Sequence, residues 1–426
     1  MKAIGIDIGT TSICGVVIDV KSGKLISSKT QNSDAFLKGC AEWEKIQQVD
    51  KIMAVATEIL DSFIDGDVSV IGVTGQMHGI VYFDSCGNAV SPLYTWQDGR
   101  GNLPYKDTTY AKYLNSCSGY GNVTDFYNKE NCLRPKNSVG YCTIQDYLAM
   151  KLCGLKKPLI HSSNAASLGC YDLTSNSFNY DCNSAVTTDY TILGKYREIP
   201  VSVAIGDNQA SVFSTLSNEN NLLVNVGTGS QVSVVTDTVV EEKNIETRPY
   251  FEGKYLVVGS ALCGGRAYSM LKDFYKEIVG YFQKPTDEEI YKAMNEMLKN
   301  SDKTPLEVNT RFAGTRSNAD IKGSISGIGV DNFTPSHLTS GILHGMCNEL
   351  FEMYKKMNVK KSGIVGSGNG LRKNASLVNV FENAFGAKMM FPAHLEEAAV
   401  GAALFALISN GTFKNANEAQ KLIQYV

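Results

Sequence analysis

The sequence predicts an α/β protein built from two related halves. Short apolar runs typical of strands alternate with a helical pattern near the N-terminus. The opening strand–turn–strand pattern returns after residue 218, and 426 residues leave room for two domains with separate cores. The polar stretch Ser217–Asn221 is the best candidate for a boundary. We therefore expect an N-terminal domain of residues 1–218 and a C-terminal domain of residues 219–426.

The first half begins with elements that are easy to place. Two β-branched runs flank a turn at Gly9–Ser12, and a third begins at Leu25, so we expect strands at Ala3–Ile8, at Ile13–Ile18 and from Leu25 onward. Apolar residues recur every three or four positions over residues 46–63, which predicts a helix. A strand at residues 68–73 then leads into a polar loop at residues 74–79.

Later segments are less uniform. Residues 101–141 are rich in Asn, Gly, Tyr and Ser and indicate no clear element. Ile199–Ile205 reads as a strand followed by a helix through Leu216, and Gly363–Val365 reads as another strand. Residues 396–404 form a predicted helix with an unusually slim face, which would let it pack close to a neighbour.

An internal repeat supports the division into halves. Ile4–Ser12 is echoed by Leu222–Ser230 at a constant offset of 218 residues: each is an apolar strand, a Gly-Thr turn and the start of a second strand. A fainter echo relates residues 70–75 to residues 362–367. Two copies of one supersecondary unit, each opening its half, predict a duplicated domain.

Composition narrows the class of protein. The formal net charge of −3 comes from 40 basic and 43 acidic residues scattered along the chain, so we expect neither a nucleic-acid nor a membrane partner. Eleven cysteines show no CxxC spacing, which argues against zinc and favours free thiols in a reducing cytoplasm. We expect no leader peptide and no membrane-spanning segment.

The paired Gly-Thr turns are candidate phosphate sites. Glycine allows close backbone approach, and successive turn N–H groups can form a concavity for an anion, with Thr and Ser hydroxyls as further donors. A tight turn without a ligand would explain either hairpin alone, whereas a nucleotide held by both explains the pair. No GxxxxGK[ST] motif occurs, which excludes a Walker-type site. The candidate residues are Gly9, Thr10, Thr11 and Ser12 in the first turn and Gly227, Thr228 and Gly229 in the second.

Two aspartates stand at strand ends. Asp7 precedes the first turn, where a carboxylate beside polyphosphate calls for Mg²⁺, although a turn-capping role would also explain it. Its counterpart in the second hairpin is the neutral Asn225. Asp207 follows a buried strand and opens a helix, so it could accept the proton of an attacking hydroxyl or serve as a helix cap.

Two further loops combine planar polar groups with aromatic or apolar ones, as sugar sites require. The first holds Gln76, Met77 and His78, and the second holds Trp96, Asp98 and Arg100. A structural histidine and a loop-holding Asp98–Arg100 salt bridge are the alternative interpretations. A late glycine-rich strand end, Gly366–Asn369, would suit a flat adenosine.

Together these segments resemble the FGGY family of carbohydrate kinases along nearly the whole chain. The resemblance rests on GIDIGTTS, TGQMHG, TWQDGR, GDNQAS, NVGTGSQ, GSGNG and EEAAVGAA, which occur in the family's order. It implies two actin-like lobes, each with a ribonuclease-H-like core, around a central cleft. ATP would lie between the lobes and the sugar deep in the cleft. It further implies that the γ-phosphate of ATP is transferred to a sugar hydroxyl.

The resemblance also implies residue roles. Asp207 would be the general base, with Mg²⁺ held near Asp7 and Asp207. The first turn and the second turn would hold phosphates. The residues implied to face the sugar are Met77, His78, Trp96, Asp98 and Asn208, and those implied for the adenosine pocket are Gly265, Gly366, Ser367, Gly368 and Asn369.

The acceptor is the least constrained expectation. TWQDGR, CGLKKPL, SSNAAS and GSGNG look most like the family's sedoheptulose kinases, which phosphorylate the terminal hydroxyl of a seven-carbon ketose. A pentulose such as xylulose or ribulose is the alternative, although xylulose kinases more usually carry Trp-Asn-Asp where this chain has Trp96-Gln97-Asp98. Non-kinase actin-like ATPases and idle sugar sensors are remoter alternatives, and a homodimer is left open.

Overall fold

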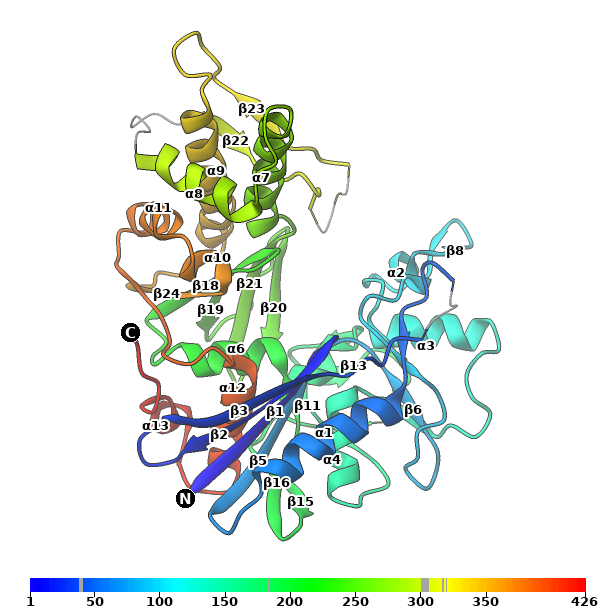
Figure 1. Cartoon of the computed structure of the whole chain (residues 1–426). Coiled ribbons are helices and arrows are strands. Elements are labelled where there is room, and N and C mark those ends of the chain that lie inside the picture. The colour runs from blue at the N-terminus through cyan, green and yellow to red at the C-terminus, as the bar shows by residue number, and fades with distance from the viewer. Residues whose placement is uncertain (38–40, 183, 300–305, 316–317, 319) are drawn as a thin grey trace. The chain divides into compact units, whose positions relative to one another are not determined.

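The chain forms two compact units, each described here by itself (Figure 1). The computed structural model describes every residue except 38–40, 183, 300–305, 316–317 and 319. Unit 1 comprises Met1–Ser217, Arg248–Lys254 and Ala393–Gln424, and unit 2 comprises Asn218–Thr247, Tyr255–Pro392 and Tyr425–Val426. The chain first passes from unit 1 to unit 2 between Ser217 and Asn218, beside the expected boundary at residues 218/219. The sequence predicted a single boundary, but two later segments, Arg248–Lys254 and Ala393–Gln424, belong to unit 1.

Unit 1 is built on a mixed sheet in the order β15-β16-β5-β1-β2-β3, with β17 also paired to β5. β1 runs antiparallel to β2 and parallel to β5, so β1 lies at the centre of the sheet. The strands expected from the N-terminal pattern all form. Their bounds are β1 Lys2–Ile8, β2 Ser12–Asp19, β3 Leu25–Asn32, β5 Val68–Gly75, β15 Ile192–Tyr196, β16 Ile199–Ser202 and β17 Ile205–Gly206.

The helices of unit 1 cover this sheet and extend from it. The first helix begins at Val49 rather than at residue 46, because Ile46 pairs in the short strand β4 with Tyr94. Buried Ile52, Ala56 and Ile59 line its inner face. The helices are α1 Val49–Phe63, α2 Tyr110–Tyr113, α3 Gly121–Glu130, α4 Ile144–Leu152, α5 Ser162–Ser167, α6 Asp207–Thr215, α12 Glu397–Ser409 and α13 Ala416–Gln420, with a 3₁₀ turn at Arg100–Asn102.

α12, drawn in red in Figure 1, comes from the end of the chain and packs on β1, β5 and α6 of unit 1. Its slim residues explain how closely it approaches. A Cβ atom at Gly5 would overlap the carbonyl oxygen of Ala399, and one at Gly72 would overlap that of Ala402. Gly401 faces the backbone of α6 in the same way. The close packing expected of this slim helix is therefore present.

The segment that the sequence left unassigned, residues 101–141, forms a small layer of helices and hairpins in unit 1. Its core is aromatic: Tyr105, Tyr110, Tyr113 and Phe126 contact one another edge-on or stacked. The sequence did not predict these short elements, because the glycines and asparagines in this segment are typical of turns and loops. The two-stranded pairs of unit 1 are β4 Ile46–Gln47 with β7 Leu93–Tyr94, β6 Val81–Phe83 with β10 Gly140–Cys142, β8 Pro104–Tyr105 with β9 Thr108–Thr109, β11 Leu159–His161 with β14 Ala185–Thr187, and β12 Tyr171–Asp172 with β13 Ser177–Phe178.

Unit 2 has its own sheet, in the order β20-β21-β19-β18-β24-β25, and its own core. The strands are β18 Asn221–Val226, β19 Ser230–Thr236, β20 Ile245–Pro249, β21 Tyr255–Ala261, β24 Gly363–Ser367 and β25 Met389–Met390, with a hairpin of β22 Glu307–Asn309 and β23 Ser324–Ser326. The helices are α7 Gly265–Gly280, α8 Asp287–Lys299, α9 Pro335–Lys356, α10 Asn369–Arg372 and α11 Ala375–Phe385. None of the helices in the described part of the chain is both long enough and apolar enough to cross a bilayer.

The two sheets confirm the internal duplication. In unit 1 the strands β16, β5, β1, β2 and β3 are neighbours in that order, and in unit 2 β25, β24, β18, β19 and β21 follow the same order. Each central strand, β1 or β18, is antiparallel to the next strand and parallel to β5 or β24. Asp7 pairs with Thr74, and Asn225 with Ser367. The fainter echo is therefore shifted by one residue, because Thr74 corresponds to Ser367.

Candidate active site

The end of β1 carries an unsatisfied acidic group. Oδ1 of Asp7 is buried and makes no hydrogen bond within the described residues. Across the hairpin, Cys14 pairs with Asp7, and its thiol donates a hydrogen bond to Oε2 of Glu396 at 3.3 Å. Burial, followed by the negative charges of Asp207 and Glu396, raises the pKa of Asp7 to about 7. A buried carboxylate near two others is a place where a cation would lower the electrostatic energy.

Asp207 occupies the first turn of α6, directly after β17. β17 is held by the sheet, because Thr74 Oγ1 donates to the carbonyl of Ile205 at 2.8 Å and Ser163 Oγ accepts from the Gly206 N–H at 3.0 Å. Burial raises the pKa of Asp207 to about 6, and the charge of Arg248 opposes part of that rise. The N-cap residue of α6 is Gly206, and the Asp207 carboxylate accepts hydrogen bonds from the backbone N–H groups of Asp207 and Asn208 in the first turn, so it also helps to satisfy the helix N-terminus.

Arg248 is a member of this site that the sequence did not reveal. Its Nη1 donates to Oδ1 of Asn208 at 3.2 Å, and its charge faces Asp207. Arg248 lies in β20, a strand without any of the motifs that drew attention elsewhere. Only its isolated positive charge next to a Pro-Tyr-Phe run could have served as a signal.

The first Gly-Thr turn is tied to both polar loops of unit 1. Thr10 Oγ1 donates to Gln76 Oε1 at 3.4 Å and accepts from the indole N–H of Trp96 at 2.9 Å. Gln47, which the sequence analysis missed, donates to the Thr10 carbonyl at 2.6 Å and accepts from Gln76 Nε2 at 3.0 Å. The Thr10 hydroxyl thus makes its hydrogen bonds within unit 1, and its role as a phosphate donor stays a prediction.

Met77 and His78 are fixed by neighbouring segments. The sulfur and methyl of Met77 lie against Gly206, at the start of α6. His78 has a positive φ of 74°, and its ring stacks on Tyr120 with centroids 4.2 Å apart. Its Nδ1 lies 2.8 Å from the carbonyl oxygen of Ser167. Because a carbonyl only accepts, Nδ1 of His78 is the donor in this contact.

Asp98 and Arg100 pair with each other inside the protein. Arg100 Nε lies 2.6 Å from Asp98 Oδ1, and the two side chains are 2% and 0% exposed. Arg100 also donates to Asn128 and lies over the ring of Tyr94 at 4.3 Å. The loop-holding salt bridge, the alternative interpretation, therefore forms. Trp96 on the same loop remains 46% exposed, so it is the residue of this loop that can offer a surface to a ligand.

In unit 2 the second Gly-Thr turn is joined to the N-terminus of α7. The N–H groups of Gly264 and Gly265 donate to the carbonyls of Thr228 and Gly227 at 3.0 and 2.8 Å. These first amides of α7 are therefore not available to a ligand, although the helix still directs its positive end toward the turn. At the adjacent strand end, Asn225 Nδ2 donates to Ser367 Oγ at 2.5 Å.

A large cavity of about 990 Å³ opens beside this turn in unit 2. Five predicted nucleotide residues line it: Gly227, Thr228, Gly265, Gly368 and Asn369. Gly229, Gly366 and Ser367 do not line it. Sequence reasoning missed the aromatic wall of Tyr268 and Tyr291, whose rings are stacked with centroids 5.8 Å apart. These tyrosines come from two helices, so no local motif joins them.

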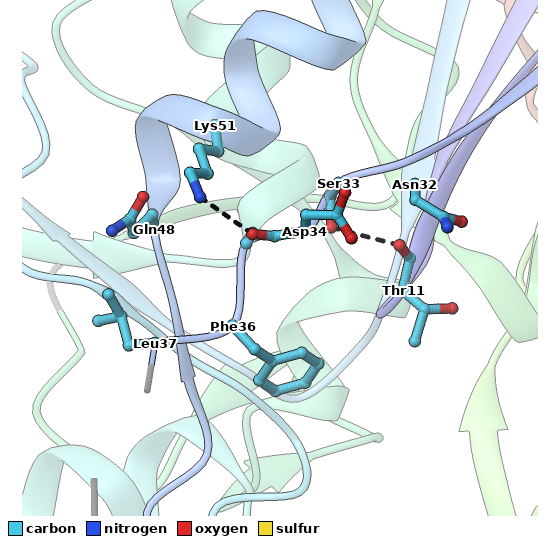
Figure 2. Close-up of a pocket in the computed structure, with 9 residues that line it drawn as sticks. Thr11, Asn32, Ser33, Asp34, Phe36, Leu37, Gln48 and Lys51 are labelled. Atoms are coloured by element: carbon cyan, nitrogen blue, oxygen red, sulfur yellow. Dashed lines mark hydrogen bonds between the residues drawn. The ribbon is translucent and has the colours of Figure 1, made fainter. Parts of the chain in front are cut away.

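A second cavity, of about 790 Å³, lies in unit 1 near the first turn and is shown in Figure 2. Asp34 and Lys51 mark its rim, where Lys51 Nζ donates to the Asp34 carbonyl at 3.2 Å (Figure 2). Ser33 Oγ donates to the carbonyl of Thr11 at 3.4 Å. The cavity contains no buried charged side chain, and we assign no ligand to it.

The carboxylates of this site bear on the binding of a metal ion. Within the described residues, no group of three or more His, Cys, Asp or Glu side chains is arranged to hold a metal ion by itself. The orphaned Oδ1 of Asp7, a hard oxygen ligand next to further negative charge, nevertheless fits Mg²⁺. Mg²⁺ keeps most of its waters and commonly takes only one or two protein carboxylates, so a complete cage is not required.

Comparison with known families identifies the family to which this chain belongs. The N-terminal domain of the FGGY family of carbohydrate kinases matches residues 2–109, and the C-terminal domain of the same family matches residues 222–409. The chain belongs to the FGGY family of carbohydrate kinases. It is therefore an ATP-dependent phosphotransferase with an alcohol group as acceptor, as the sequence motifs predicted.

Individual relatives agree with the family. The chain is 28% identical to a sedoheptulokinase of Mus musculus, over 95% of this chain and 97% of the relative, and 27% identical to a sedoheptulokinase of Homo sapiens. A glycerol kinase of Aquifex aeolicus is 24% identical over 97% of this chain and 91% of the relative. A xylulose kinase structure from Lactobacillus acidophilus covers 100% of this chain and 92% of its own, with a TM-score of 0.84 and 17% identity. The actin-like fold of the FGGY kinases is thereby confirmed.

Proposed function

We propose that this FGGY kinase transfers the γ-phosphate of ATP to the terminal hydroxyl of a ketose, with sedoheptulose as acceptor and sedoheptulose 7-phosphate as product. Support comes from the relatives named sedoheptulokinase, which align with nearly the whole chain. The Trp96-Gln97-Asp98 loop supports the same choice over a pentulose such as xylulose or ribulose.

One observation carries the catalytic assignment: Asp207 lies in the first turn of α6, directly after β17, and the charge of Arg248 acts on its buried carboxylate. Its carboxylate accepts a hydrogen bond from the acceptor hydroxyl and orients that oxygen. Phosphoryl transfer has a loose transition state in most analyses, so orientation and charge neutralisation contribute more than early deprotonation. Asn208, one residue along α6, contacts the sugar beside Asp207.

The remaining sugar contacts come from the two polar loops of unit 1. Trp96 offers an exposed indole face to the C–H side of the sugar, and His78 offers its imidazole ring, which stacks on Tyr120. Gln76, Met77, Asp98 and Arg100 are buried, and they hold these loops in place. Their contribution is to reduce the freedom of Trp96 and His78, which lowers the entropic cost of binding.

The nucleotide belongs to the cavity of unit 2. Gly227, Thr228, Gly265, Gly368 and Asn369 allow close approach of phosphates and adenosine, and Tyr268 and Tyr291 form an apolar wall beside them. In unit 1, the turn of Gly9, Thr10, Thr11 and Ser12 supplies the second set of proposed phosphate contacts. Asp7 and Asp207 are the carboxylates that would hold Mg²⁺, which supplies positive charge to shield the phosphate oxygens.

The proposal is tested by ADP release with a panel of acceptors: sedoheptulose, xylulose, ribulose and glycerol. We expect sedoheptulose to give the highest kcat/KM and Asp207→Ala to lose turnover while ATP binding by calorimetry is retained. Asp189→Ala, an exposed aspartate of unit 1, is the matched control. Near-normal turnover in Asp207→Ala would remove the catalytic assignment. Sugar-independent ATP hydrolysis would instead favour a non-kinase actin-like ATPase, and a preference for xylulose would move the acceptor to the pentuloses.

A further inference from the structure

Arg248 forms a defined contact with the sugar side of α6. Nη1 of Arg248 lies 3.2 Å from Oδ1 of Asn208, and both residues belong to unit 1. Asn208 is the second residue of α6 and is partly exposed, directly after Asp207. Within the described residues, Nδ2 of Asn208 makes no hydrogen bond, so its two protons can serve a ligand.

The chemistry of the two side chains fixes which way this amide points. A guanidinium group has five N–H donors and no acceptor, and it stays charged at every working pH. An asparagine amide has an acceptor on one side and two donors on the other. Oδ1 must therefore face Arg248, and a flip of the amide would place N–H groups against N–H groups. The amide is held with its NH₂ group as the end available to a ligand.

We propose that Arg248 is a positioning residue for the acceptor: by accepting no hydrogen bond itself, it fixes the Asn208 amide so that an N–H donor meets an oxygen of the sugar next to the hydroxyl that is phosphorylated. This inference rests on the proposed function, because it assumes that a polyhydroxylated acceptor lies at Asn208. The inference adds Arg248 of β20 to the residues that shape the sugar site. Arg248 does not touch the sugar itself, but it decides whether Asn208 offers an N–H donor or a carbonyl acceptor to the sugar.

Arg248 can also act through its charge on Asp207, and the experiment must separate this effect from the orientation of Asn208. The charge of Arg248 acts on Asp207, the charges of Asp207 and Glu396 act on Asp7, and the Cys14 thiol donates to Glu396. Loss of Arg248 therefore alters the charge at Asp207 and with it kcat. The orientation of Asn208 acts on binding of the acceptor, so it is measured through the KM or Kd of the sugar.

The test is a double-mutant cycle on Arg248→Gln and Asn208→Ala, with Arg248→Lys as the conservative variant and Arg197→Gln as control. Arg197 is a 55% exposed arginine of unit 1. Gln can donate or accept, so it no longer fixes the amide, whereas Lys still only donates. We expect Arg248→Gln to raise the sugar KM about tenfold, the range of one net hydrogen bond, with the ATP KM unchanged. Arg248→Lys should recover most of this loss, and Arg197→Gln should change neither constant.

The cycle distinguishes the outcomes. In the Asn208→Ala background, Arg248→Gln should raise the sugar KM by less than twofold, because the amide it positions is gone. Equal effects in both backgrounds, or an unchanged sugar KM in Arg248→Gln, would overturn the inference while leaving the kinase assignment intact. Calorimetry with sedoheptulose in the absence of ATP gives the same comparison without turnover. Failure of the proposed function appears instead in the wild type, as absence of binding and turnover with every sugar, and it would overturn the inference as well.

Discussion

The two Gly-Thr hairpins share a topology but differ in the residue that precedes the turn. In unit 1, Asp7 is the last residue but one of β1; it has a buried oxygen without a partner within the described residues, and Asp207 and Glu396 add negative charge. In unit 2, Asn225 is the last residue but one of β18, and its Nδ2 donates a hydrogen bond to Ser367 Oγ at 2.5 Å. One copy of the duplicated unit thus has a carboxylate oxygen without a hydrogen-bond partner within the described residues, whereas the other has a neutral amide that is hydrogen-bonded. The two copies share a backbone topology, but their side chains differ in charge at this position.

The central strand pairs of the two sheets differ in side-chain size. Gly5 pairs with Gly72 in unit 1, and at the corresponding positions in unit 2 Leu223 pairs with Val365. The glycines of unit 1 admit the backbone of α12, which leaves no room for a Cβ atom. The core of unit 1 therefore includes a segment from the far end of the chain. α12 can pack this closely on β1, the strand that carries Asp7, because Gly5 and Gly72 have no side chains.

The largest expected effect, a loss of stability, follows from adding a side chain at Gly72, where unit 2 has Val365. Gly72→Ala places a Cβ atom on the carbonyl oxygen of Ala402, and backbone on both sides cannot move aside as a flexible side chain could. We expect unit 1 to lose more than about 3 kcal/mol of stability, seen as a lower midpoint of urea unfolding. Gly66→Ala is the matched control, since a Cβ atom there meets nothing within 4 Å. Equal stability of the two variants would show that α12 does not pack as described.

Next in size is the effect of making the two hairpins alike at Asp7. Asp7→Asn keeps the shape of the side chain but removes the charge that Mg²⁺ requires from a carboxylate. We expect kcat to fall by about a hundredfold or more, the range seen when one transition-state contact is lost. ATP binding at the unit 2 cavity should persist, measured by calorimetry. Turnover within a few-fold of the wild type would show that the contrast between Asp7 and Asn225 has no catalytic meaning.

The sequence predicted the strands, the duplication and the strand-end acids because these depend on local pattern. Apolar runs and Gly-Thr turns mark β1, β2, β18 and β19 wherever they occur. It did not place α12 in unit 1, since a slim helix face does not say which sheet it meets. It also missed Gln47, Arg248 and the Tyr268–Tyr291 wall, because each gains its role from a partner distant in the chain.

A third prediction uses a buried acid of unit 1, Asp146. Asp146, 2% exposed, accepts hydrogen bonds from Thr143 Oγ1 at 2.6 Å and Asn164 Nδ2 at 3.0 Å, and burial raises its pKa to about 7. Because the folded state holds this proton more tightly than the unfolded state, stability falls as pH rises from the unfolded pKa towards about 7 and is level above it.

Asp146→Asn removes this titration while keeping an oxygen acceptor for Asn164. Between about pH 5.5 and pH 7, the loss of unfolding free energy should be smaller in the variant by about 2 kcal/mol, at 1.36 kcal/mol for each unit of pH. Urea unfolding at both pH values measures the difference. Asp7 and Asp207 also have raised pKa values, so part of the pH dependence should remain. Identical slopes for variant and wild type would place the pH dependence elsewhere.

The smallest expected effect is the reciprocal change in unit 2, Asn225→Asp. Ser367 Oγ can donate to a carboxylate, so the strand-end contact and the melting temperature should be kept. Asn225 lines the unit 2 cavity, where a new negative charge would face the phosphates of ATP. We expect the Kd of ATP to rise about tenfold, with a weaker effect at high salt because the added charge is screened. Asn358→Asp, an exposed residue of unit 2 outside the cavity lining, controls for the change in net charge. If Asn225→Asp bound ATP as tightly as the wild type, the neutral residue in the second hairpin would be a relic of the duplication rather than a requirement of nucleotide binding.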